Sequence, residues 1–97
     1  MTTVSIEQRH IDEGKPCYAS RCPAALAIKE KTGKKVGVGL TYIEFPDPKR
    51  GIVEAALVPL NLREWITSFD RDNDGKPITF EFEIDRHFKL PLPRQLR

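Results

Sequence analysis

The sequence has no long apolar run. Its two longest runs, residues 22–28 and 55–60, are far shorter than the roughly 20 residues that a membrane-spanning helix needs. No charged-then-apolar leader opens the chain either, because residues 2–9 already alternate polar and apolar side chains. We therefore expect no membrane association and a cytoplasmic location.

The sequence also has little cysteine and little net charge. A disulfide between its two cysteines, Cys17 and Cys22, would close only a very small loop, and cytoplasmic thiols are normally reduced. Sixteen Lys and Arg residues nearly balance fourteen Asp and Glu residues, which leaves a net charge of +2. This excess is too small to indicate nucleic-acid capture by itself, so nucleic acid is only a weak alternative partner.

Catalytic and zinc-binding patterns are missing as well. His10 and His87 are the only imidazoles, and no spacing places either of them as a base beside Cys22, although a helix N-terminus would lower the pKa of that thiol. As zinc ligands, the two histidines would have to join a Cys-x4-Cys pair that is looser than a zinc knuckle. We expect both histidines on the surface and no enzyme activity.

What is present is the length and pattern of one small α+β domain. The chain has 97 residues, of which 31% are charged and 39% hydrophobic, as is typical of a globular domain. We expect strands at residues 2–6, 36–45, 52–58 and 78–85, and helices at residues 7–13, 23–31 and 61–69. This order predicts a three- or four-stranded, mostly antiparallel sheet with two helices on one face, and a ferredoxin-like β-α-β-β-α-β arrangement fits it. Residues 1–85 would form the domain, and residues 86–97 a basic, proline-containing tail.

The helix boundaries have clear signals. Pro23 suits a first helical residue, and Gly33 suits a left-handed stop. Asn61 and Glu64 have the spacing of a capping box for the last helix. The apolar stripe of that helix, which we expect in the core, consists of Leu62, Trp65, Ile66 and Phe69.

One acidic segment matches a calcium-binding loop. Asp70, Asp72, Asp74, Gly75 and Glu81 have the spacing of an EF-hand loop, in which carboxylates ligate the ion and a glycine permits the sharp turn. Against this, the segment after the loop has strand periodicity, and the eighth loop position is a proline. An acidic turn explains the same residues, so calcium remains an alternative.

Two basic sites are candidates for binding. Ser20 and Arg21 precede the Pro23 helix, whose unpaired N–H groups favour anions, and Tyr18 beside them can stack on a ring. The other candidate is a lysine cluster that includes Lys34 and Lys35. Capping by Ser20 and a favourable helix dipole for the lysines explain these residues without a ligand.

Several short motifs resemble a family of short proteins from bacteriophages, prophages and assorted bacteria, a family without an assigned biochemical role. The motifs are Ile11-Asp12-x-Gly14, Cys17-x4-Cys22-Pro23-x-Ala25-Leu26-Ala27, Phe69-Asp70 and Phe80-Glu81-Phe82. The resemblance carries over no functional residues. It implies a bacterial host cell and a protein that binds and blocks a host factor, as anti-CRISPR and other counter-defence proteins do. We therefore hypothesise a non-catalytic binding protein whose partner is a host protein or a small anionic, nucleotide-like ligand.

Overall fold

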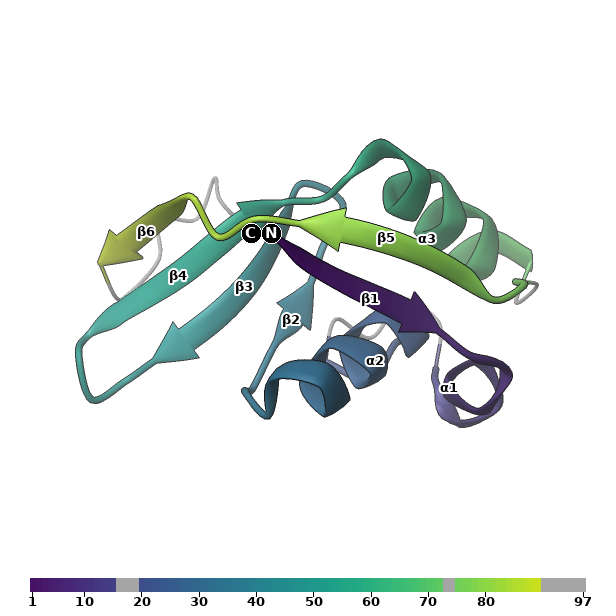
Figure 1. Cartoon of the computed structure of the whole chain (residues 1–97), viewed down its shortest axis with the longest axis horizontal. Helices are drawn as coiled ribbons and strands as arrows, with labels where there is room; N and C mark the ends of the chain where they lie inside the picture. Colours follow the sequence, from purple (N-terminus) through teal and green to yellow (C-terminus); the bar gives the residue numbers. More distant parts are fainter. Residues whose placement is uncertain (16–19, 73–74, 90–97) are drawn as a thin grey trace.

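The computed structural model describes residues 1–15, 20–72 and 75–89, and this part of the chain forms three helices and six strands (Figure 1). In chain order the elements are β1 (Thr2–Ile6), α1 (Gln8–Glu13), α2 (Pro23–Thr32), β2 (Gly37–Val38), β3 (Tyr42–Asp47), β4 (Ile52–Leu57), α3 (Leu60–Asp72), β5 (Ile78–Phe82) and β6 (Arg86–Lys89). The predicted α+β class is confirmed. None of the helices in the described ranges is long and apolar enough to cross a membrane.

The strands form two antiparallel sheets. One is the two-stranded β1–β5 ribbon, and the other has four strands in the order β2-β3-β4-β6. A ferredoxin-like sheet would place the first strand beside β4. That edge of β4 is occupied by β6, which pairs with it from Ile52↔Lys89 to Ala55↔Arg86. The ferredoxin-like arrangement is therefore not formed, and Arg86–Lys89, which we assigned to a tail, form a strand instead; residues 90–97 lie outside the described part.

A second difference concerns residues 36–45, which we expected to form one strand. The chain reverses there, so that β2 and β3 form a tight hairpin in which Val38 pairs with Ile43 and the Gly39 N–H donates to the Tyr42 carbonyl over 3.0 Å. In the sequence, the apolar residues stand at even positions up to Leu40 and at odd positions for Ile43 and Phe45. The reversal explains this change, since Val38 belongs to β2 and the two later residues belong to β3.

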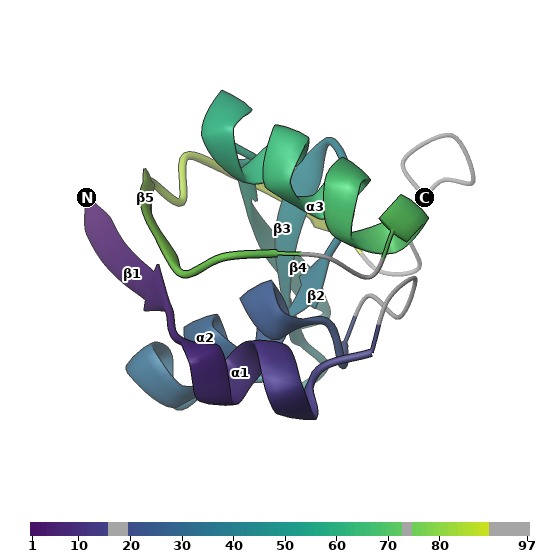
Figure 2. The same cartoon turned by 90° about the vertical axis from the view of Figure 1, so that its right-hand side faces the viewer.

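All the layers meet in one core. The ribbon and the two longer helices pack against the face of the four-stranded sheet that carries Ile43, Phe45 and Ala56, with α3 on one side of the ribbon and α1 and α2 on the other (Figure 2). Phe45 and Phe82 stack across the gap between the two sheets with their ring centroids 5.9 Å apart. The expected apolar stripe of α3 is confirmed, because Leu62, Ile66 and Phe69 are buried and Trp65 packs at the core's margin.

The ends of the helices follow local chemistry. Pro23 is the first residue of α2, and Gly33 ends this helix with φ 72°, both as expected. The α3 helix begins at Leu60, one residue before the expected cap, so Asn61 lies inside its first turn. There the Asn61 side-chain amide donates to the Thr79 carbonyl, and the Trp65 indole N–H donates to the Lys76 carbonyl over 2.7 Å. These two bonds attach α3 to β5 and to the segment that precedes it.

Gly14, where α1 ends, allows the start of α2 to approach closely. A Cβ at position 14 would lie 2.6 Å from Cδ of Pro23 and 2.7 Å from its backbone nitrogen. We expect Gly14→Ala to lower the free energy of unfolding by about 1–3 kcal/mol, because the rigid proline ring must shift. Urea unfolding measures the change. The matched control is Gly37→Ala, whose Cβ would meet no heavy atom within 4 Å, and equal unfolding midpoints for the two variants would contradict the packing described here.

Candidate functional site

The most densely connected polar cluster joins α1 to α2. Its centre is His10, the only buried polar residue of the described chain, whose side chain is 5% exposed. Helix α1 begins after Glu7, and the Glu7 backbone N–H donates to His10 Nδ1 over 2.9 Å. The His10 ring thus closes the first turn of α1 from inside, in the manner of a capping box. Our expectation of an exposed His10 is wrong, because we did not recognise this cap.

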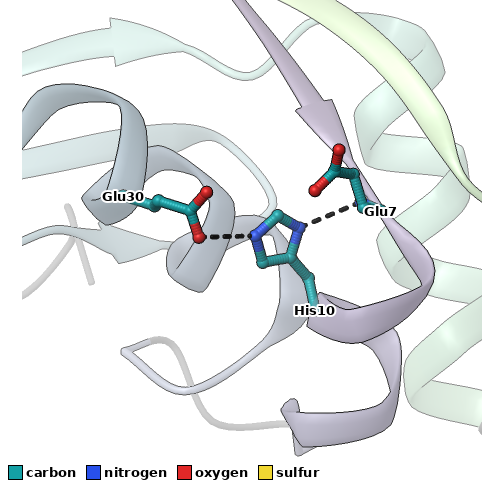
Figure 3. Close-up of side chains that lie close together, drawn as sticks. All are labelled: Glu7, His10 and Glu30. Carbon is teal, nitrogen blue, oxygen red and sulfur yellow. Dashed lines mark hydrogen bonds and ion pairs between the residues drawn. The ribbon is translucent and has the colours of Figure 1, made fainter.

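The bond to the backbone fixes the proton on the other ring nitrogen. Since Nδ1 accepts a hydrogen bond, a neutral His10 carries its proton on Nε2. Nε2 lies 3.1 Å from Oε2 of Glu30 on α2 and donates to it (Figure 3). Both nitrogens are therefore used, and no buried side-chain nitrogen or oxygen in the described residues lacks a partner.

Arg9 connects the two carboxylates of the cluster. Its Nε donates to Glu7 Oε2 over 2.7 Å, and its two terminal nitrogens donate to the two carboxylate oxygens of Glu30. Such a bidentate pair fixes the carboxylate in direction as well as in place. The hydrogen bonds from Arg9, followed by the one from His10, lower the pKa of Glu30 to about 2, and the bonds to Glu30 and Glu7 raise the pKa of Arg9.

This cluster is also the one group in the described chain with metal-ligand geometry. Glu7, His10 and Glu30 each offer a ligand atom, and these atoms lie within 4.8 Å of one another. A metal would need a lone pair on His10, yet Nδ1 accepts the Glu7 N–H and Nε2 carries the proton. The cation between the two carboxylates is the guanidinium of Arg9. The cluster is therefore a polar clamp between the helices.

The clamp determines the charge of the end of α2. Glu30 is the only acid within residues 29–35, a stretch that also holds four exposed lysines: Lys29, Lys31, Lys34 and Lys35. Both oxygens of Glu30 point to α1 and are bound there. Within the described ranges, none of the four lysines has an ion pair. We call these four residues the α2 lysine surface.

A shallow hollow of about 240 Å³ adjoins this surface. It is lined by Lys34 and Lys35 and by Phe45, Pro46, Asp47 and Glu54 of the neighbouring hairpin. Arg50 lies 3.8 Å from both Asp47 and Glu54. The lysine pair thus borders a surface of mixed charge.

The other predicted binding residues lie elsewhere. Ser20 and Arg21 are exposed in the turn before α2, and Tyr18 is outside the described part of the chain. The ten residues of α2 separate this turn from Lys34 and Lys35 by about 15 Å, at 1.5 Å per residue. The two predicted basic sites therefore do not form one site.

Cys22, and not Ser20, caps α2. Its Sγ accepts a hydrogen bond from the Ala25 N–H over 3.4 Å, and the residue is buried. We expected the helix N-terminus to lower the pKa of this thiol. Burial raises it instead, because a thiolate loses its hydration there, and the bonds from the helix backbone only partly offset this loss.

The structure describes three of the four carboxylates of the predicted calcium loop and does not bring these three together. Asp70 and Asp72 belong to the last turn of α3, while Asp74 lies outside the described residues. Glu81 is on the exposed side of β5, where its carboxylate accepts a hydrogen bond from Thr3. Asp70, Asp72 and Glu81 form no group of ligand atoms within 4.8 Å, and a strand follows the loop in place of an exiting helix.

Comparison with protein-family models found no match, and searches of the curated proteins and of the solved structures found none either.

The burial of Cys22 predicts a slowly reacting thiol. In a Cys17→Ser variant Cys22 is the remaining cysteine. We expect it to react with Ellman's reagent much more slowly in the folded protein than in guanidinium chloride, because the sulfur is buried and its thiolate is disfavoured. The release of thionitrobenzoate measures the rate. Equal rates in the two states would mean that Cys22 is not the buried cap.

The lowered pKa of Glu30 predicts a dependence of stability on pH. An ordinary glutamate has a pKa of 4.5, whereas that of folded Glu30 is about 2. In this range the unfolded chain binds the proton more tightly, so the contribution of Glu30 is complete above pH 4.5 and is lost as the pH falls toward 2. We expect Glu30→Gln to flatten the curve of unfolding free energy against pH between these values. Urea unfolding at several pH values measures the slope, and an unchanged slope in Glu30→Gln would contradict the clamp. Glu64→Gln, at an exposed glutamate outside the clamp, is the matched control.

Proposed function

We propose that this chain is a non-catalytic binding protein that engages an acidic surface of another protein through the α2 lysine surface. One observation supports the proposal above all. The single acid within the lysine stretch is held by Arg9 and His10 on α1, so its charge is not used by the neighbouring lysines. Because the whole protein has a net charge of only +2, this excess of positive charge is local to the α2 lysine surface.

The surroundings of Lys34 and Lys35 favour a protein partner over a nucleic acid. Asp47 and Glu54 line the adjoining hollow, and they would repel a uniform row of phosphates. A protein surface with both signs of charge can complement such a neighbourhood, because its basic residues can face the two acids while its acidic residues face the lysines.

The biological setting is taken from the resemblance to short phage proteins. In a bacterial host cell, a small protein with an exposed basic surface and a compact core can act by occupying the contact surface of a host factor. We propose that mode of action, blocking by occupancy, for this chain. It requires no cofactor, and it predicts that the contact residues can be changed without unfolding the protein.

Charge reversal of the lysine pair tests the proposal. We expect Lys34→Glu combined with Lys35→Glu to remove specific partners from a pull-down in nuclease-treated bacterial lysate, because two attractive contacts become repulsive. Proteins retained by the wild-type bait are identified by mass spectrometry and compared between baits. Circular dichroism should show an unchanged fold, because both lysines are exposed.

The matched control is Arg63→Glu combined with Lys76→Glu, which removes the same charge from exposed positions at α3 and the segment after it. This control should retain the partners of the wild-type protein. Identical partner lists for the two variants would remove the lysine surface from consideration. Wild-type partners that are captured only when the nuclease is omitted would indicate nucleic acid instead.

A further inference from the structure

We propose that Arg9 is a positioning residue for the α2 lysine surface: it acts through Glu30, by holding that carboxylate on the α1 side of the helix. The inference rests on the proposed function, and it assigns control over the charge of the α2 lysine surface to one side chain. Arg9 is on α1, so it belongs to a different element from the surface that it would serve.

The geometry gives Arg9 a second attachment point. While its two terminal nitrogens bind Glu30, its Nε donates to Glu7 over 2.7 Å. The guanidinium is therefore anchored at the start of α1 and cannot follow Glu30 to another rotamer without losing the Glu7 bond. A lysine at position 9 could make one contact at a time, because its ammonium group is a point charge without the planar fork.

Lysines close to Glu30 in the sequence are alternative partners for its carboxylate. Its side chain is 51% exposed, and Lys29 and Lys31 flank it in the sequence. Lys34 lies beyond Gly33, where the helix ends, so the two flanking lysines are the alternative partners on the helix itself. Two adjacent residues pair in this way on α3, where Arg71 Nε donates to Asp72 over 2.9 Å. Without the fork of Arg9, the single bond from His10, 3.1 Å long, would hold one oxygen, and the other oxygen could pair with a lysine. One lysine would then be withdrawn from the binding surface.

An effect of Arg9 through its charge alone can be distinguished from an effect through the position of Glu30. An Arg9→Lys variant keeps the positive charge, so a role of Arg9 through its long-range field predicts unchanged binding. The positioning role predicts weaker binding for Arg9→Lys, because Glu30 is released. It also predicts that the identity of residue 9 becomes unimportant once Glu30 is neutral.

The test is a double-mutant cycle over Arg9→Lys and Glu30→Gln. The probe is a fluorescein-labelled polyglutamate peptide of about 20 residues, and the readout is the dissociation constant from fluorescence anisotropy at several salt concentrations. We expect Arg9→Lys to weaken binding by about threefold and to make its salt dependence shallower, because fewer lysines take part. In the Glu30→Gln background the same change should have no effect. Each variant is measured at a temperature where circular dichroism shows it folded.

The outcomes separate the inference from the proposed function. Unchanged binding by Arg9→Lys would overturn the positioning role. So would equal weakening in both backgrounds, because Arg9 would then contact the probe directly. If the Lys34→Glu and Lys35→Glu variant binds the probe as well as the wild-type protein does, the proposed function fails and the inference fails with it. Loss of binding by that lysine variant together with no coupling in the cycle rejects the inference alone.

Discussion

The bidentate contact between Arg9 and Glu30 is the constraint on which the functional surface depends. It joins α1 to α2, and with the bond from His10 it uses both oxygens of the only acid in the lysine stretch. An ion pair that is half exposed stabilises a fold only modestly. Its larger effect is directional, because it determines to which side the charge of Glu30 is turned. Among the described residues, none of the four lysines of the same stretch forms an ion pair.

A second constraint, the pairing of β4 with β6, determines the architecture around this surface. Because β6 occupies the edge of β4 that the first strand would otherwise take, β1 pairs with β5 in a separate ribbon. That ribbon packs against the core with Val4, Ile6, Phe80 and Phe82, and α1 and α2 lie together on one side of it. The clamp between α1 and α2 thus forms where the ribbon leads into the first helix.

Local sequence patterns predicted the helices and strands better than they predicted which strands lie next to each other. Pro23, Gly33 and the α3 stripe behave as expected because each depends on backbone geometry or on helical spacing within one segment. The β6 pairing was missed because it depends on contacts between distant segments, which spacing does not encode. The β2–β3 reversal was missed because the change of apolar phase was interpreted within a single strand. At the site, the lysines were identified from their density, whereas Arg9 and His10 were not. The one available signal was a histidine three residues after Glu7 at a helix start, together with a single acid among the lysines of α2.

The charge state of Glu30 in solution shows most directly whether the clamp between α1 and α2 is formed. A titration of its side-chain carboxyl carbon by NMR, with the signal assigned by its loss in Glu30→Gln, reports whether Arg9 and His10 hold this carboxylate. We expect a midpoint well below the ordinary value for glutamate, at about 2, because Arg9 and His10 donate hydrogen bonds to the charged carboxylate. A midpoint near 4.5, the ordinary value for glutamate, would mean that Glu30 is released from Arg9 and His10 and available to the lysines, and that the clamp is not formed.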